Sequence, residues 1–107
     1  VSFNQEIISD KFFFRIGKFE IDDLVIKKED GEVLILEAST EYTLWHCAYS
    51  SDNFLKAILY CVDVFNDNIL IPERYNDIET LKVKAKECAD LAGGLKYLSF
   101  FETMFAV

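Results

Sequence analysis

Residues 49–65 show the strongest periodicity of the chain, and this stretch constrains the fold more than any other. Apolar side chains recur there at helical intervals of four, three and four residues: Phe54, Ile58, Cys61 and Phe65. Three further apolar positions widen this face: Leu55, Leu59 and Val62. Ser50 or Ser51 is expected to cap the first turn, because either hydroxyl can accept a hydrogen bond from a free backbone N–H. The width of the apolar face predicts a helix that lies across a sheet rather than along another helix.

Two aliphatic segments flank an acidic turn and form the clearest β-hairpin of the sequence: residues 23–27 and 33–37. A three-residue loop with Gly31 in the left-handed region is preferred to a two-residue turn, because it places Lys28 rather than Glu29 opposite Glu32. This register pairs the aliphatic residues across the strands: Leu24 with Leu36, and Ile26 with Leu34. Both faces of the hairpin are aliphatic, so one must pack on the helix and the other must be covered by a further segment or a partner.

Two more segments alternate as strands do, residues 12–16 and residues 42–49. Gly17 is expected to end or bulge the first of them. Residues 1–11 have weak periodicity and are expected to form either a frayed lead-in or the end of a segment that was cut away. Short connections between successive strands favour an antiparallel meander of three to four strands.

Three signals delimit the helices. The polar run at residues 66–68 is expected to end the first helix, and Asn76 with Glu79 resembles a capping box that begins a second one. Gly93-Gly94 should end that second helix, and the aromatic residues 95–107 are expected to form a short third helix. Because strands precede helices, the predicted fold class is α+β, with two to three helices packed on one face of the meander.

The length and composition point to one globular domain. A chain of 107 residues with 51% hydrophobic side chains can bury one core. It contains no apolar run near the roughly 18 residues that span a bilayer and no signal-like segment, so we expect a cytoplasmic protein. Three cysteines are an odd number at spacings that fit neither a disulfide framework nor a zinc site, and we expect them to be reduced core residues: Cys47, Cys61 and Cys88.

Residue patterns typical of catalysis are weak in this sequence. His46 is the single histidine and lies in a predicted strand, which favours a structural role over a catalytic one. Its neighbour Cys47 would point to the other side of the sheet, so the two do not form a metal site. The four glycines form no phosphate-binding loop, and adjacent acids such as Asp22-Asp23 or Glu29-Asp30 are more typical of a solvated turn than of an acid–base pair. We therefore expect no enzyme, no cofactor and no metal.

The net charge of −8 is concentrated in one part of the chain. Residues 20–41 hold eight acids and two lysines. Such a stretch disfavours nucleic acid or an anionic membrane as a partner, because both require cationic side chains, and it favours a basic protein. A solvated acidic surface without a partner is the other interpretation that the charge allows.

Four stretches, taken in their order along the chain, resemble the SUKH superfamily, also called SMI1/KNR4-like: residues 14–17, 23–26, 30–33 and 49–55. In that family a strand ending in glycine leads to a second strand, an acidic turn with glycine, a third strand and a serine step into a helix with an early phenylalanine. The aromatic residues near 97–105 are similar to the end of the SUKH-4 branch. Members usually begin with a helix bearing Leu-Pro and Asn-Gly, which is not found before Phe12. We therefore expect residues 1–107 to form a single SUKH-like domain that lacks this helix, or else a divergent or unrelated α+β protein.

The resemblance implies a bacterial immunity protein that binds and neutralises a cognate toxin, often a nuclease. An acidic surface suits this role, because a nuclease active site is cationic and association would be accelerated by charge. The residues expected to face such a basic toxin are all acidic: Asp22, Asp23, Glu29, Asp30, Glu32 and Glu37. The alternative is a regulatory or sensor domain that binds a small ligand in the aromatic-lined space between sheet and helices.

Overall fold

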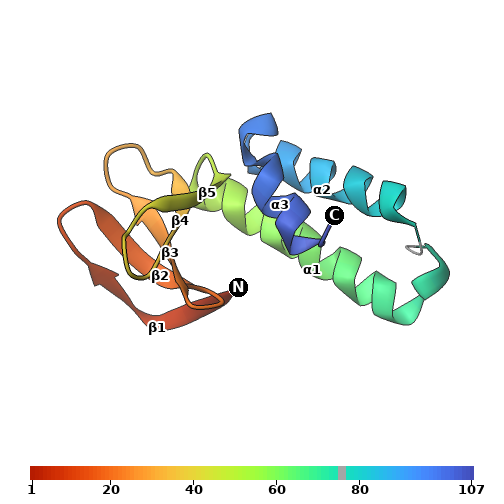
Figure 1. The fold of residues 1–107 in the computed structure, drawn as a ribbon, viewed down its shortest axis with the longest axis horizontal. Helices are drawn as coiled ribbons and strands as arrows, with labels where there is room; N and C mark the ends of the chain where they lie inside the picture. The colour runs from red at the N-terminus through yellow and green to blue at the C-terminus, as the bar shows by residue number, and fades with distance from the viewer. Residues whose placement is uncertain (75–76) are drawn as a thin grey trace.

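The computed structural model describes residues 1–74 and 77–107, which form a five-stranded antiparallel sheet followed by three α-helices (Figure 1). The strands are β1 (Ser2–Ser9), β2 (Phe13–Phe19), β3 (Asp22–Lys27), β4 (Val33–Leu36) and β5 (Thr43–Ala48). The helices are α1 (Ser51–Leu70), α2 (Ile78–Ala92) and α3 (Leu98–Met104), with short 3₁₀ segments η1 (Pro72–Arg74) and η2 (Leu95–Tyr97). The α+β class and the antiparallel meander are confirmed, with one strand more than expected.

The sheet and the helices lie side by side along the longest dimension of a 46 × 25 × 24 Å molecule (Figure 1). Strand order follows chain order, so β5 is the edge strand that faces the helices. The main neighbour of α1 is α2, and the expectation that α1 would lie across the sheet is wrong. Small residues explain this packing, because they let two helices approach closely. The fully buried residues of α2 are all small: Ala85, Cys88, Ala89 and Ala92.

One face of the sheet shares the main core with the helices. Leu24, Val33 and Ile35 are fully buried on this face and belong to the same apolar cluster as Phe54 of α1. Phe100 of α3 lies at the centre of the cluster, with no exposed surface. Its ring centroid lies 5.1–6.5 Å from four other aromatic rings, those of Phe19, Trp45, Phe54 and Phe101. Burial of these rings explains why a sheet with few helical contacts outside β5 still forms one domain with the helices.

The opposite face of the sheet has a smaller apolar cluster. Val25, Leu34 and Leu36 are buried there, and Phe13 of β2 packs against them. Arg15 pairs with Val25 in the β2–β3 register, so the two side chains leave from the same face. The side chain of Phe13 from β2 thus covers part of the second aliphatic face of the hairpin.

The β3–β4 register differs by one residue from the predicted one. Leu24 pairs with Ile35 and Val25 with Leu34, and the five residues 28–32 join the strands. Lys27 N donates to the Glu32 carbonyl at 2.9 Å and Gly31 N donates to the Lys27 carbonyl at 2.8 Å, which closes the loop. Gly31 has a φ of 81°, and its predicted left-handed conformation is confirmed.

The first residues form a strand, although a frayed lead-in was expected. Every residue of β1 is exposed, and pairing with β2 holds the strand in place. Gly17 makes this pairing possible, because a Cβ atom there would lie 2.1 Å from the Ser2 carbonyl oxygen. The β2–β3 register shifts between Arg15 and Gly17, so of the two predicted alternatives for Gly17 the bulge is confirmed.

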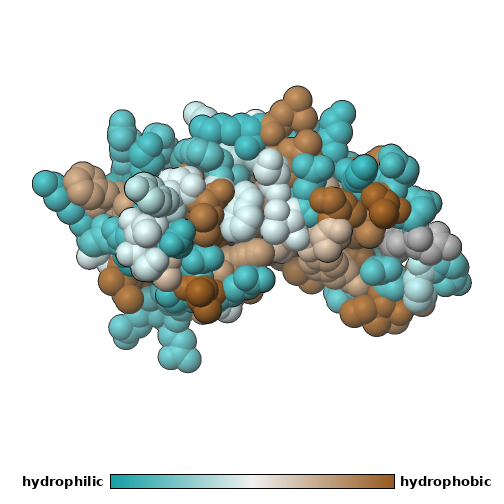
Figure 2. All heavy atoms as spheres, viewed as in Figure 1, coloured by the Kyte–Doolittle hydropathy of each residue, from teal (hydrophilic) through white to brown (hydrophobic). Residues whose placement is uncertain are grey.

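The helix boundaries follow the predictions only in part. Ser50 caps α1, as one predicted alternative had it, with its hydroxyl accepting from Asn53 N at 3.2 Å. The polar run at 66–68 does not end this helix, which continues to Leu70. Three residues expected to widen the buried face are instead 46–57% exposed: Leu55, Leu59 and Val62. Brown side chains interrupt the teal surface over both the sheet and the helices (Figure 2).

The second helix ends as expected, whereas the third is shorter than the predicted residues 95–107, because α3 covers only Leu98–Met104 after the 3₁₀ segment η2. Asn76, the predicted cap of α2, lies outside the described residues, and the Asp77 carboxylate accepts from Thr80 N at 2.7 Å. Gly93 ends α2, as predicted. The three cysteines are free and buried, also as predicted, and within residues 1–74 and 77–107 no helix is long and apolar enough to cross a bilayer.

Candidate functional site

The six acids predicted to face a partner lie at two opposite ends of the β3–β4 hairpin. One group belongs to the β3–β4 loop: Glu29, Asp30 and Glu32. The other group lies where β3 begins and β4 ends: Asp22, Asp23 and Glu37. The four residues of β4 separate the two ends by about 13 Å, at roughly 3.3 Å per residue. The hairpin therefore does not bring the six carboxylates together into one surface.

Glu32 is an internal carboxylate, with only 6% of its surface exposed. It accepts from Lys96 Nζ at 2.8 Å and from the Tyr97 hydroxyl at 3.0 Å, and its other oxygen lies 3.1 Å from His46 Nδ1. Burial alone would raise the pKa of Glu32, but the three hydrogen-bonding partners outweigh it and the pKa lies below its ordinary value. Glu32 thus joins the sheet to η2 and is not on the exposed acidic surface.

The same contacts act on Tyr97. Burial and the hydrogen bond to the Glu32 carboxylate raise the pKa of the Tyr97 phenol to about 12. A small cavity of about 130 Å³ opens beside the pair and is lined by Asp30, Glu32, Tyr49, Lys96 and Tyr97. Both carboxylate oxygens of Glu32 thus have hydrogen-bonding partners.

Asp23 is held by cations on the outer face of the sheet. Arg15 donates from Nη1 to Asp23 and from Nε to Asp10, both at 2.8 Å, and from Nη2 to Glu41. Lys18 pairs with the second oxygen of Asp23. Backbone N–H groups of Phe13 and Phe12, followed by Arg15, lower the pKa of the Asp10 carboxyl below its ordinary value. Both carboxylate oxygens of Asp23 are therefore bound by cations of the protein itself, those of Arg15 and Lys18.

The remaining predicted acids lie at the surface. Glu29 and Asp30 have exposed side chains, 3.9 and 3.7 Å from Lys27 Nζ. Asp22 and Glu37 are half-buried and accept one hydrogen bond each, from Ala38 N at 3.2 Å and from Ser39 Oγ at 2.9 Å. Each of these two carboxylates therefore has a second oxygen that can accept a hydrogen bond from a partner.

Glu20 and Glu41 lie at the same end as Asp22 and Glu37 and were not among the six. Glu20 is in the β2–β3 turn and Glu41 in the β4–β5 loop, and both are exposed. Their signal was available, because both belong to the acidic stretch 20–41, but only the fold shows that the two loops meet at one end of the sheet. We call this surface the acidic end: Glu20, Asp22, Glu37 and Glu41.

His46 lies in β5, and the described contact of its ring is the one with Glu32. Within residues 1–74 and 77–107 no three His, Cys, Asp or Glu side chains are grouped so that they could hold a metal ion. The exposed carboxylates of the acidic end are suited to contact with a cationic surface.

Comparison of the chain with protein-family models, with curated proteins and with solved structures finds no match. The resemblance to the SUKH superfamily therefore depends on the four stretches of sequence alone.

Proposed function

We propose that this protein is a non-catalytic binding protein that neutralises a basic toxin in the cytoplasm, in the manner of the SUKH-type immunity proteins that its sequence resembles. The toxin would be held at the acidic end. The observation that supports this most directly is that Glu20, Asp22 and Glu37 form no ion pair with any residue in 1–74 and 77–107. These carboxylates keep their charge available for an outside partner.

The charges around the acidic end favour fast association with a cation-rich surface. Arg15 and Lys18 are the cations nearby; both are bound to Asp23, and Arg15 also pairs with Glu41. An approaching basic protein is therefore attracted by Glu20, Asp22 and Glu37 without strong competition from these cations, and this attraction raises the association rate. A nuclease whose cationic cleft receives these acids would be unable to bind its nucleic acid.

The proposal is tested by identifying the reading frame next to the one that encodes this chain and co-purifying its C-terminal domain with the protein. A one-to-one complex that abolishes the toxicity of that domain is the expected result. A neighbouring product that is neither toxic nor retained overturns the proposal.

The place of contact is tested by matched charge reversals. Glu20→Lys with Glu37→Lys is expected to slow association by about tenfold or more at low salt, because several charges steer the encounter. Glu29→Lys with Glu73→Lys changes the net charge by the same amount away from the acidic end and should slow association far less. Equal effects of the two pairs would show that only net charge matters and would remove the acidic end as the contact surface.

A further inference from the structure

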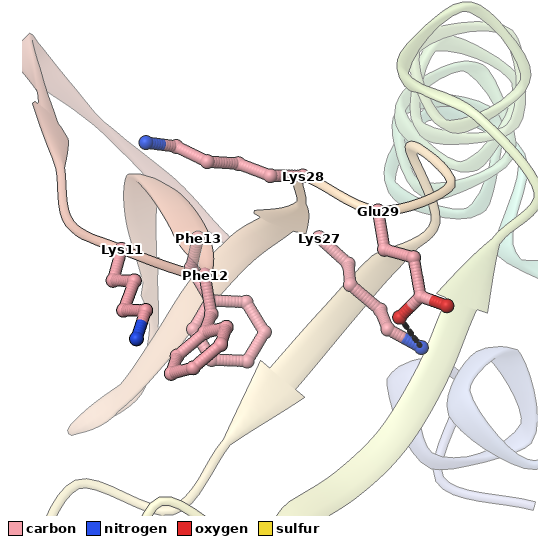
Figure 3. A pocket seen from close by; sticks show the side chains of 6 residues that line it. All are labelled: Lys11, Phe12, Phe13, Lys27, Lys28 and Glu29. Carbon is pink, nitrogen blue, oxygen red and sulfur yellow. Dashed lines mark ion pairs between the residues drawn. The ribbon is translucent and has the colours of Figure 1, made fainter.

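The end of the sheet opposite the acidic end holds an open groove of about 530 Å³ (Figure 3). It lies between the loop that joins β1 to β2 and the end of β3, and its walls are Lys11, Phe12, Phe13, Lys27, Lys28 and Glu29. Two phenyl rings and the aliphatic stems of three lysines supply most of its surface. In Figure 3 the rings lie on one side and the Lys27–Glu29 ion pair on the other.

The wall that presents the aromatic rings is fixed by hydrogen bonds. Asp10 Oδ1 accepts from Phe12 N at 3.0 Å and from Phe13 N at 2.8 Å. Lys28 N donates to the Phe12 carbonyl at 2.9 Å, and Lys28 Nζ donates to Ser9 Oγ at 2.7 Å. Phe12 is nevertheless 62% exposed. An aromatic side chain held toward solvent by an ordered loop loses little further freedom when it binds a ligand.

The rim of the groove is cationic, although the whole chain has a net charge of −8. Lys11 forms no ion pair within residues 1–74 and 77–107, and its Nζ lies 5.3 Å from the centroid of the Phe12 ring. The contacts of Lys27 Nζ with Glu29 and Asp30 are long, at 3.9 and 3.7 Å, and involve exposed carboxylates, so they contribute little and can be exchanged. The groove therefore offers two accessible ammonium groups beside an apolar surface.

We infer that this groove binds a small amphipathic carboxylate of the fatty-acid class. The apolar chain would lie against Phe12 and Phe13, and the carboxylate would pair with Lys11, whose Nζ lies next to the Phe12 ring. Lys27, on the other side of the rings, would add to the positive potential of the groove (Figure 3). The volume lies within the range of about 300–1,000 Å³ that is usual for small-ligand sites. This inference is independent of the proposed toxin binding, because the groove and the acidic end lie at opposite ends of the β3–β4 hairpin.

The experiment is a titration of the protein with decanoate below its micelle concentration, followed by amide NMR. We expect saturable one-to-one binding that shifts the amides of residues 11–13 and 27–29. Decanol, which has the same chain without the charge, should bind about tenfold more weakly, a loss equal to about 1.4 kcal/mol. Decyltrimethylammonium, with the opposite charge, should not bind there. Absence of saturable binding, or equal binding of decanol, overturns the inference.

Two exposed positions test the site without disturbing the core. Phe12→Ser and Lys11→Glu are each expected to weaken decanoate binding by about tenfold, while Lys86→Glu on the exposed side of α2 makes the same charge change as Lys11→Glu and should leave it unchanged. The dispersion of the NMR spectrum reports whether each variant is folded. Undiminished binding in both folded groove variants, or shifts centred on the helices, places the ligand elsewhere and overturns the inference.

Discussion

The charged clusters around Glu32 and Arg15 are built in opposite ways. Glu32 is a buried anion surrounded by donors from β5 and η2, and 8% of its side chain is exposed. Arg15 is a cation with 19% of its side chain exposed, surrounded by acids that reach 57% exposure at Glu41. The first cluster joins the sheet to the helical half, whereas the second joins the β1–β2 and β4–β5 loops to strands β2 and β3 on the outer face.

The difference in burial decides what each cluster contributes. A buried carboxylate must keep its partners, because an unpaired polar group away from water is costly. A partly exposed guanidinium exchanges its acids for water at little cost, and salt screens its interactions. We therefore expect Glu32 to stabilise the fold and Arg15 mainly to order the loops around it.

The largest effect should come from Glu32→Gln, which keeps the shape and removes the charge. We expect the free energy of unfolding to fall by about 2 kcal/mol, since hydrogen bonds to a charged group contribute roughly 1.5–3 kcal/mol. Urea denaturation measures the change, and Tyr97→Phe, which removes one donor, should cost about 1 kcal/mol. A loss below that of Tyr97→Phe would contradict the central role of the carboxylate.

The pH dependence of stability separates the two residues of this pair. The native pKa of Glu32 is lowered, so its contribution is complete above the unfolded value of about 4.3 and is lost as the pH falls through the native pKa. The native pKa of Tyr97 is raised to about 12, so its contribution is complete below the unfolded value near 10 and is lost as the pH rises through the native one. As the pH falls through the acid range, the difference in the free energy of unfolding between wild type and Glu32→Gln should shrink. At alkaline pH, the free energy of unfolding of the wild type should decline, and Tyr97→Phe should remove the part of this decline that comes from Tyr97.

Arg15→Gln should have a smaller effect than Glu32→Gln, with a loss of about 1 kcal/mol, because three partly exposed ion pairs disappear together. The loss should decrease further in high salt, since the interactions are screened. Urea denaturation at low and high sodium chloride measures both quantities. A loss that equals that of Glu32→Gln and does not depend on salt would remove the contrast between the clusters.

The smallest effect is expected for Glu41→Gln, which removes the most exposed acid of the Arg15 cluster. The change in the free energy of unfolding should stay within about 0.5 kcal/mol, as for exposed ion pairs in general. Thermal unfolding followed by circular dichroism is sufficient to measure it. A larger loss would show that the β4–β5 loop depends on this contact.

The β3–β4 hairpin was predictable from the sequence in its strands but not in its register. The two strands and the conformation of Gly31 were predictable from aliphatic alternation and from the acidic turn. The register was not, because pairing Lys28 with Glu32 was preferred on charge, whereas Glu32 is bound by Lys96 and Tyr97. Those partners are far along the chain, and no local rule contains them.

Tertiary contacts also explain the other differences. β1 was missed because all its residues are exposed and its pairing depends on the close approach to Gly17. α1 passes through the polar run at 66–68, and the turn just before this run is packed, with the ring of Phe65 5.0 Å from that of Phe105. Weak local propensities are readily overridden by such contacts. At the candidate site, the sequence indicated which stretch is acidic, but only the fold separates Glu32 and Asp23, which are bound internally, from Glu20, which is exposed.

The strand order has a consequence for the order of assembly. Each strand pairs with its neighbour in the chain, so the contacts of the sheet are local and their loops are quick to close. The Tyr97–Glu32 hydrogen bond instead joins residues 65 positions apart, and closing so long a loop costs more entropy. We therefore expect the meander to form before the helices dock on it. The contact that joins the two halves is then a late event in folding and an early one to break during unfolding.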